Sequence, residues 1–420
     1  LKNLRDFIKT SVTKHNPFLD FDINTPIWKP KPFQMADRVY EIQTALIEHD
    51  TVIIQGPPGT GKTYLMSQIC NALLKANFRI LVTAMTNRAL IELAEKEHLK
   101  EALKEGKVFK TSLTADEQKN KKIKGIRAFK RLKEQKPPLL LSTYYKMSQI
   151  AQKAMEDEHF DYIIIEEASQ AFLSTIAITR KLGKKVIIVG DICQLEPIFH
   201  MEFSEEDPNN YGAMVCGLRS LSYYYKNSKN FILTDSHRLT KKSVYATNAF
   251  YDDQLKSISD SVLPLGFKEN TNSARLLNSF GGPSVKRIDL DDGYNPSVYS
   301  IKLISDLITE LIEIGLKEGV AVLAFNVATV KKLQSQIGQK FKNHPDIYIE
   351  TVDRIQGMTV DYCIYVITKE SIPFAINPNR FNVATSRAKL CTLILTDRNI
   401  DYFLKDQPLV EDYFRRIAEF

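Results

Sequence analysis

The sequence predicts an α/β protein with two RecA-like P-loop domains, each a mostly parallel sheet flanked by helices. Three observations lead to this fold class. The chain has 420 residues, which is longer than a single hydrophobic core usually serves. Short, continuous apolar runs recur along it with room for a helix between them, as in sheets covered on both faces. One of these runs leads directly into a glycine-rich turn and a helix.

The apolar runs fall into two sets, and each set predicts one sheet. A helical pattern at 33–49 precedes the first set. Its runs are TVIIQ at 51–55, RILVTA at 79–84, PLLLSTY at 138–144, YIIIEE at 162–167 and KVIIVGD at 185–191. The runs of the second set are VKRIDL at 285–290, GVAVLAF at 319–325, DIYIETV at 346–352, DYCIYVI at 361–367 and CTLILTD at 391–397. We therefore predict an N-terminal segment over 1–33, a first domain over 34–235 and a second over 236–420.

Composition excludes several classes of protein. Hydrophobic residues make up 44% of the chain and charged residues 25%, as in ordinary globular domains. We find neither an apolar stretch of about 18 residues nor a signal peptide, so we expect no membrane partner and an intracellular location, cytoplasmic or nuclear. The five scattered cysteines favour neither disulfides nor zinc. Because the first residue is Leu1, we expect a processed protein or a fragment of a longer one, with further domains or protein partners outside it.

Positive charge is concentrated in one segment. The formal net charge is +7, but residues 96–136 alone contain fourteen Lys or Arg against six Asp or Glu. This excess falls within a short basic helical insertion that we predict at about 93–137. Solvated lysine-rich helices are one interpretation, and contact with the phosphates of a polyanion is the other.

The glycine-rich turn predicts an ATP site. Its eight residues match GxxxxGK[ST] between a buried strand and an apolar-periodic helix. Backbone amides at such a helix start point at phosphate, the lysine neutralises the β and γ phosphates, and the threonine hydroxyl binds Mg²⁺. The residues are Gly56, Pro57, Pro58, Gly59, Thr60, Gly61, Lys62 and Thr63.

Carboxylates at the end of a neighbouring strand complete the predicted catalytic set. Glu166 is expected to hold Mg²⁺ and Glu167 to act as general base on the attacking water. Gln194 follows the next strand and has the side chain needed to sense a γ-phosphate. Arg238 and Arg387 have the type needed to stabilise charge on that phosphate.

The order of these motifs resembles superfamily 1 helicases, in the group of the nonsense-mediated-decay helicase, senataxin and the Dna-two nuclease-helicase. The resemblance extends from Gln34 to about Asp397. It rests on the boxes GPPGTGKT at 56–63, EEASQ at 166–170, GDICQLEP at 190–197, SHRLT at 236–240, VDRIQG at 352–357 and PNRFNVATSRAK at 378–389.

The resemblance implies ATP in the cleft between two RecA-like domains and further site residues. Gln34 stands where the family reads adenine. Phe325 stands where the family stacks an aromatic ring on adenine, with core packing as the alternative. The VDRIQG box adds Gly357 to the nucleotide-binding residues. Phosphate contacts with a single strand are expected from Thr86, Asn87, Thr143 and Thr351.

Three features depart from the family pattern. Glu166 replaces the usual Asp, and its extra methylene would shift the metal and slow hydrolysis. Ser236 and His237 replace Gln-Tyr before the arginine. The insertion is too short for the barrel that many members have, which favours a direct nucleic-acid contact for the basic segment.

We therefore expect an ATP-dependent helicase or translocase on single-stranded DNA or RNA, moving 5′ to 3′ by resemblance. The alternative is a nucleotide-gated nucleic-acid-binding or assembly switch that hydrolyses ATP slowly and does not unwind. A small-molecule kinase leaves the second motif-bearing sheet unexplained. The sequence leaves open the choice between DNA and RNA.

Overall fold

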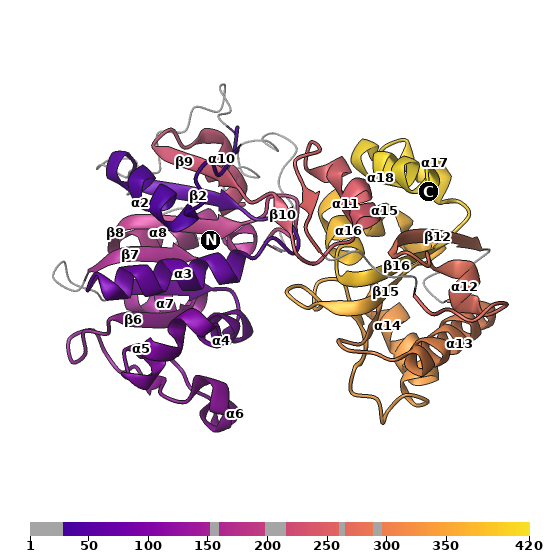
Figure 1. Ribbon diagram of the computed structural model, residues 1–420, viewed down its shortest axis with the longest axis horizontal. Helices are drawn as coiled ribbons and strands as arrows, with labels where there is room; N and C mark the ends of the chain where they lie inside the picture. The colour runs from indigo at the N-terminus through magenta and orange to yellow at the C-terminus, as the bar shows by residue number, and fades with distance from the viewer. Residues whose placement is uncertain (1–27, 152–158, 198–215, 260–264, 289–295) are drawn as a thin grey trace. The chain divides into compact units, whose positions relative to one another are not determined.

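The computed structural model describes residues 28–151, 159–197, 216–259, 265–288 and 296–420. Contacts between residues divide the chain into two compact units (Figure 1). The first unit comprises Leu1–Gly56, Gly61–Ile192 and Glu196–Leu233. The second comprises Pro57–Thr60, Cys193–Leu195 and Thr234–Phe420. Most of the predicted N-terminal segment, residues 1–27, lies outside the described residues.

The first unit is built on a nine-stranded parallel sheet in the order β1-β9-β2-β8-β7-β3-β6-β4-β5. The strands are β1 Lys31–Pro32, β2 Thr51–Gln55, β3 Ile80–Ala84, β4 Val108–Lys110, β5 Arg127–Ala128, β6 Leu139–Thr143, β7 Phe160–Ile165, β8 Gly183–Gly190 and β9 Ser228–Ile232. All five predicted runs are strands, and β2 and β3 are buried at every residue because helices cover both faces.

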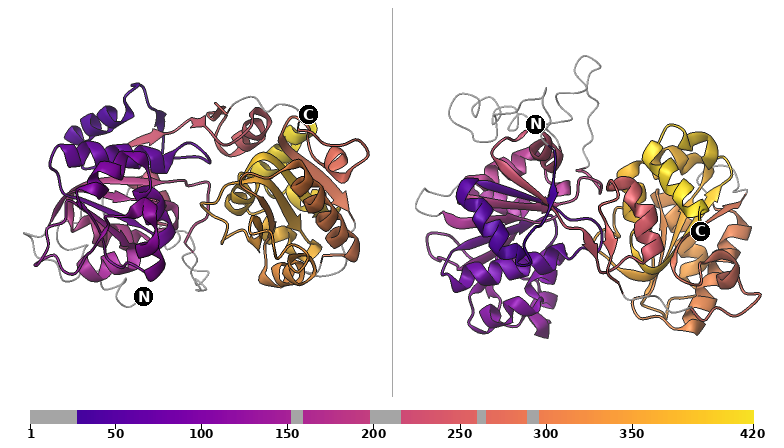
Figure 2. Two further views of the ribbon diagram at one scale, coloured as in Figure 1. Left: turned by 60° about the horizontal axis from the view of Figure 1, so that its bottom comes forward. Right: turned by 45° about the horizontal axis from the view of Figure 1, so that its top comes forward.

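Two hydrophobic clusters hold these helices against the two faces of the sheet (Figures 1 and 2). Helices α2 Arg38–Glu48, α3 Lys62–Lys75, α4 Asn87–Ala94 and α5 Lys100–Lys104 pack on one face. Helices α7 Tyr144–Ala151, α8 Leu173–Arg180 and α10 Gly217–Tyr224 pack on the other. Apolar side chains alternate between the clusters along β2, with Val52 and Ile54 in one and Ile53 in the other.

The basic segment is more varied than the predicted helical insertion. It contains α5, the one-turn helix α6 Ala115–Lys119 and 3₁₀ turns at Glu97–Leu99 and Lys121–Ile123. It also contributes β4 and β5, which extend the sheet beyond β6. The prediction did not include these strands, because two or three residues between lysines carry no readable apolar period.

The second unit is built on a five-stranded parallel sheet in the order β12-β16-β15-β13-β14. The strands are β12 Gly282–Ile288, β13 Val320–Ala324, β14 Ile347–Thr351, β15 Val360–Ile367 and β16 Ala388–Asp397. All five predicted runs of the second set contain strands in their described residues, with 289–290 outside them, so the prediction of two parallel sheets is confirmed. A separate pair, β10 Asp235–Ser236 and β11 Lys256–Ser257, was not predicted.

Helices also cover both faces of the second sheet (Figure 2). One face carries α12 Asn272–Leu276, α13 Val298–Ile314 and α14 Val327–Leu333, the last running into a π-helical turn at Gln334–Gly338. The other carries α11 Lys241–Thr247, α15 Ile372–Ala375, α16 Pro378–Thr385, α17 Ile400–Leu404 and α18 Pro408–Ala418. Within the described ranges of both units, no helix is long and apolar enough to cross a bilayer.

The parallel topology gathers the predicted site residues of the first unit at one edge of its sheet. The P-loop follows the carboxyl end of β2, and Glu166 follows that of β7. Thr86 follows β3, while Thr143 is the last residue of β6. Ligands of open α/β sheets bind at this edge, so the fold supports the site predicted from the motifs.

Candidate nucleotide and nucleic-acid sites

The P-loop is shaped by glycine at three points. Gly59 and Gly61 have φ of 74° and 81°, a left-handed region that favours glycine. A Cβ on Gly56 would lie 2.1 Å from Cγ of Lys62, so only glycine lets the lysine fold back across the loop. The Lys62 ammonium donates a hydrogen bond to the Gly56 carbonyl. The turn therefore holds this cation against the loop, at the start of α3.

Thr63 and Glu166 form a pair with oxygen atoms suited to a hard cation. The Thr63 hydroxyl donates to Oε1 of Glu166 at 2.8 Å, although 103 residues separate them. The Glu166 residue is 4% exposed, and its Oε2 is buried without a hydrogen-bond partner among the described residues. An orphaned carboxylate oxygen beside a hydroxyl matches the oxygen ligands that Mg²⁺ prefers. The residues present thus fit the predicted metal.

The environment of Glu166 opposes a buried negative charge. The pKa of this carboxyl is raised to about 8, first by burial and then by the charge of Glu167, against the opposing effects of the Thr63 hydrogen bond and Lys62. Desolvation disfavours the ionised form of a carboxyl group, whereas a bound divalent cation favours it. Binding of a metal at this site is therefore coupled to the loss of a proton from the Glu166 carboxyl.

Glu167 has a strained backbone. Its φ of 52° and ψ of 36° place it in the left-handed region, directly after the Glu166 peptide. A non-glycine residue in this region costs on the order of 1–3 kcal/mol, and such residues cluster at functional sites. The buried Tyr144 hydroxyl donates to the Glu166 carbonyl and thereby fixes this turn. The strain supports a functional role for the Glu167 side chain.

The second unit brings together the segments that carry Gln194, Arg238 and Arg387. Nη1 of Arg238 donates to the Ser386 carbonyl at 3.2 Å, next to Arg387 in sequence. Asn382, on the helix before Arg387, donates to the Cys193 carbonyl at 2.7 Å. Gln194, the next residue after Cys193, therefore lies near α16.

Arg387 is more enclosed than an exposed arginine finger. The residue is 2% exposed, and its Nε donates to the Val383 carbonyl at 2.8 Å. Its Nη1 also lies 3.4 Å from the Met358 carbonyl, so the guanidinium links α16 to the VDRIQG segment. The sequence did not indicate that Arg387 would be buried and hydrogen-bonded to backbone carbonyls of its own unit.

Contacts group Pro57–Thr60 with the second unit, around Ser236. The Ser236 hydroxyl donates to the Pro58 carbonyl at 2.9 Å, and the His237 amide donates to the Gly59 carbonyl at 2.9 Å. A Cβ on Gly59 would lie 2.5 Å from Cβ of Arg238. Ser236 thus supports the loop directly. The sequence showed only that Ser236 differs from the family pattern and did not indicate this role.

The predicted base-reading residues lie in different settings. Gln34 is exposed, and its backbone amide donates to Glu41 at 2.9 Å. The Phe325 ring stacks on Phe374 with centroids 5.2 Å apart, and Cζ of Arg380 lies 4.8 Å from its centroid. Phe325 therefore belongs to a stacked aromatic and cationic group on its own unit. Gly357 is exposed, with φ of 83°.

Three of the predicted nucleic-acid contacts lie on the first unit and one on the second. Thr86 caps α4 by accepting from the Ala89 amide at 3.2 Å, and both Thr86 and Asn87 are exposed. Thr143 is half-buried at the end of β6 and pairs in register with Ala84 of β3. Thr351, at the end of β14, is 9% exposed. The first three thus share one edge of one sheet.

Lys110 connects the basic segment to Asn87. Its ammonium donates to Oδ1 of Asn87 at 2.7 Å, to Oε2 of Glu117 at 3.2 Å and to the Ser112 carbonyl. The residue is only 1% exposed. Because an ammonium is only a donor, it fixes the amide with its oxygen inward and directs its NH₂ group away from Lys110. Nothing in the sequence separates Lys110 from the other basic residues of the segment.

A second residue that sequence reasoning missed is Asp191, which lies between the P-loop strand and Gln194. Its Oδ1 accepts from Nε2 of Gln55 at 3.2 Å, and both residues are buried. This bond ties the carboxyl ends of β2 and β8 together. The Gly-Asp pair at the end of the predicted strand was the available signal.

Comparisons with known proteins support the same family. Two family models described as AAA domain match residues 40–200 and 219–399. DNA-binding protein SMUBP-2 of Mesocricetus auratus is 25% identical over 455 residues, covering 90% of this chain and 44% of its own length. Regulator of nonsense transcripts 1 of Dictyostelium discoideum is 25% identical over 412 residues, covering 85% and 30%.

The chain spans less than half the length of these two relatives. A crystal structure of arterivirus nonstructural protein 10 (helicase) covers 87% of this chain and 64% of its own, at 13% identity and a TM-score of 0.46. The two AAA-domain matches fall on the two sheets, in the order of the motifs. The chain belongs to the superfamily 1 helicases, in the group that includes SMUBP-2 and regulator of nonsense transcripts 1.

Proposed function

We propose that this chain hydrolyses ATP with Mg²⁺ and uses the energy to move along single-stranded nucleic acid inside the cell. The contact between Thr63 and the buried Glu166, beside the lysine of the P-loop, is the observation that carries the proposal. It joins a phosphate-binding turn to a carboxylate with one oxygen still unpaired among the described residues. Nucleoside-triphosphate hydrolysis requires this combination of groups.

In the first unit each side chain has one role. Lys62 neutralises charge on the β and γ phosphates, while Thr63 and Glu166 hold the metal, which supplies further neutralisation of the phosphate oxygens. Glu167 accepts a proton from the attacking water, because its carboxylate follows the metal-holding residue at the end of β7. Its strained backbone supports this role, since strain at this position has no other evident benefit.

In the second unit, we assign Gln194 to sensing the γ-phosphate and Arg238 and Arg387 to stabilising its developing charge. The Arg238 contact with the Ser386 carbonyl supports a common function for the two arginines. Gln34, Phe325 and Gly357 remain our candidates for the rest of the nucleotide. Phe325 would have to offer the adenine a face not taken by Phe374 or Arg380.

For the nucleic acid, we propose that Thr86, Asn87 and Thr143 bind phosphates at the carboxyl edge of the first sheet, with Thr351 contributing from the second. Hydroxyl and amide groups are common phosphate ligands in such interfaces. The name of SMUBP-2 describes a DNA-binding protein, which supports nucleic acid as the partner. Movement from 5′ to 3′ is part of the proposal and rests on the resemblance alone.

ATP hydrolysis by the purified chain tests this function. We expect single-stranded DNA or RNA to raise the rate at least tenfold, and less at higher salt, because phosphate contacts weaken as counterions accumulate. Phosphate release is measured alone and with each polymer, at low and moderate salt. The more effective polymer identifies the substrate. A rate that neither polymer changes would contradict translocation.

Replacing Lys110 tests the proposed contact of Asn87. We expect Lys110→Met to raise the strand concentration for half-maximal ATPase stimulation about fivefold, with the rate at saturation nearly unchanged. The reason is that a freely rotating Asn87 amide loses about one hydrogen bond to the phosphate, worth about 1 kcal/mol. Stimulated hydrolysis is measured as a function of strand concentration.

Lys107→Met is the matched control, because Lys107 lies in the same segment and pairs with Glu105 at the surface. Lys110→Met also leaves Glu117 without its cationic partner, so the double variant with Glu117→Gln separates stability from strand affinity. An unchanged half-maximal concentration in a folded Lys110 variant would show that the amide does not bind the strand.

A nucleotide-gated switch is the second candidate, and the identity of Glu166 favours it. A longer carboxylate than the usual Asp, with a raised pKa, is expected to place the metal differently and slow hydrolysis. Strand displacement from a tailed duplex separates the two functions. A helicase releases the strand with ATP, whereas a switch binds the substrate and releases none.

A further inference from the structure

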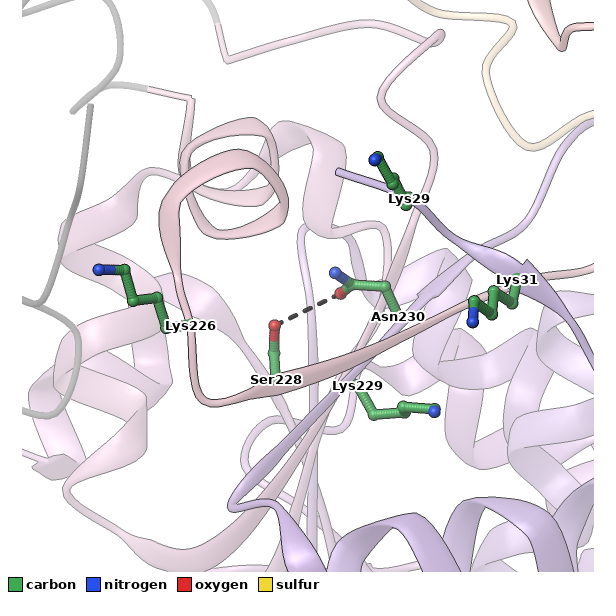
Figure 3. A pocket seen from close by; sticks show the side chains of 6 residues that line it. All are labelled: Lys29, Lys31, Lys226, Ser228, Lys229 and Asn230. Atoms are coloured by element: carbon green, nitrogen blue, oxygen red, sulfur yellow. Dashed lines mark hydrogen bonds between the residues drawn. The ribbon is translucent and has the colours of Figure 1, made fainter. Parts of the chain in front are cut away.

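A lysine-rich hollow lies at the lateral edge of the first sheet that β1 and β9 form (Figure 3). Its volume is about 280 Å³. Two segments about 200 residues apart form it, because β1 pairs with the end of β9. The lining residues are Lys29, Lys31, Lys226, Ser228, Lys229 and Asn230.

The hollow is distinct from the site described above. Ser228 pairs with Thr51 at the amino end of β2, and Lys31 pairs with Phe231, which is level with Ile54 near the carboxyl end, so the hollow runs along β9 at the lateral edge of the sheet. Four strand spacings separate β9 from β3 by about 19 Å, and five separate it from β6 by about 24 Å. The contacts predicted at Thr86 and Thr143, which follow or end these strands, therefore lie four to five strand spacings from the hollow.

Charge makes this hollow suited to an anion. No ion pair is formed by Lys29, Lys31 or Lys229 within the part of the chain that the structure describes. Asp50, beside the amino end of β2, is already shared by Arg180 at 3.5 Å and Lys185 at 3.4 Å. The positive potential is thus not cancelled by a lining carboxylate, and phosphate groups are the anions that lysines commonly bind.

The arrangement of the side chains favours an extended anion over a small one. Ser228 and Asn230 lie on one face of β9, with the Ser228 hydroxyl 3.4 Å from Oδ1 of Asn230. In Figure 3 the four ammonium groups point in different directions, with Lys229 on the other side of β9 from this pair, and do not converge on one point. The volume is at the lower limit of small-ligand pockets, and its lining lacks the apolar side chains that such pockets use.

Each of the two segments that line the hollow has an aromatic residue close by in sequence, and these two residues stack on each other. The rings of Trp28 and Tyr223 stack with centroids 6.1 Å apart and an interplanar angle of 10°. Trp28 precedes Lys29, and Tyr223 lies three residues before Lys226. Aromatic rings beside lysines are the usual composition of a surface that binds nucleic acid, because bases stack where the backbone is held.

We propose that this hollow is a second nucleic-acid site, which binds the phosphate backbone of the strand beyond the contacts proposed for Thr86, Asn87 and Thr143. The inference rests on the proposed function, since it extends the same substrate to the β1–β9 edge of the first sheet. Lysines on an edge strand also prevent edge-to-edge pairing of sheets, which is the alternative role to exclude.

The test compares wild-type protein with the triple variant Lys29→Gln, Lys31→Gln and Lys229→Gln. Binding is measured by fluorescence anisotropy across a salt series, with labelled strands of about 6 and about 40 nucleotides. For the long strand we expect about tenfold weaker binding and a log–log salt slope less negative by about 2, since three phosphate contacts are lost. Affinity for the short strand, and the hydrolysis that it stimulates, should not change.

The control triple variant is Lys75→Gln, Lys184→Gln and Lys342→Gln, which removes the same charge from exposed lysines elsewhere. An unchanged log–log salt slope in the test variant overturns the inference. An equal loss of affinity for the short and the long strand also overturns it, as does an equal loss of affinity in the control variant. Aggregation with unchanged affinity, measured by light scattering, assigns the lysines to edge protection. If inorganic phosphate at constant ionic strength removes the difference in strand affinity between wild-type protein and the test variant, the hollow is a site for free phosphate instead. Wild-type protein that binds neither strand contradicts the proposed function itself, and the inference with it.

Discussion

Lys62→Ala is expected to lower nucleic-acid-stimulated ATP hydrolysis by about 10²- to 10³-fold, the cost of removing one charge-stabilising donor from a reacting oxyanion. The side chain lies at the start of α3 and donates to the Gly56 carbonyl, so it reaches across the turn that is expected to hold the phosphates. Phosphate release at saturating strand measures the effect. ATP affinity should fall as well, because the lysine contacts the phosphates before and during the reaction.

Lys75→Ala is the matched control for this variant. Lys75 lies in the last turn of the same helix and is exposed, so it shares the helix but not the phosphate turn. Equal thermal stability of the two variants would show that folding is intact. Stimulated hydrolysis that survives in Lys62→Ala would remove the P-loop from the mechanism.

Glu167→Gln is expected to lower the hydrolysis rate by about 10²- to 10⁴-fold, which is the usual contribution of a general base. The affinity for ATP should stay within about twofold of the wild-type value. Glutamine keeps the size of the side chain but cannot accept the proton from water. The effect should therefore fall on kcat and not on nucleotide binding. A fluorescent ATP analogue measures binding, and single-turnover phosphate release measures the chemical step.

Glu48→Gln is the control for the lost charge, because Glu48 is an exposed carboxylate at the end of α2. It should leave both quantities unchanged. If Glu167→Gln weakens ATP binding as much as hydrolysis, Glu167 positions the nucleotide and another group takes the proton.

The long strands were predictable because their burial is continuous. TVIIQ at 51–55 and DYCIYVI at 361–367 are buried on both faces, and that burial demands an unbroken apolar run that is visible in the sequence. Strand β9 was missed because SKNFI has two apolar residues and lies near the sheet edge. Strand order was not predictable, since it depends on contacts between segments that are far apart in sequence.

The P-loop could be found from the sequence because its chemistry requires particular residues at fixed spacing. The burial of Lys110 and of Arg387 could not, because a cation's enclosure is decided by neighbours from other segments. The lysine hollow shows the same limit. Its two segments carry four lysines but lie about 200 residues apart, and the charge count along the chain singled out only the segment at 96–136.

The place of β2 in its sheet has a consequence for the time at which the P-loop forms during synthesis. Strand β2 ends at Gln55, yet its two neighbours, β8 and β9, end at Gly190 and Ile232. Pairing across such separations is slow, because a long loop must close before any contact is gained. On the ribosome, the phosphate turn would stay without its supporting strands until more than half of the chain had been made. ATP would therefore be a ligand of the finished first sheet and not of the nascent segment.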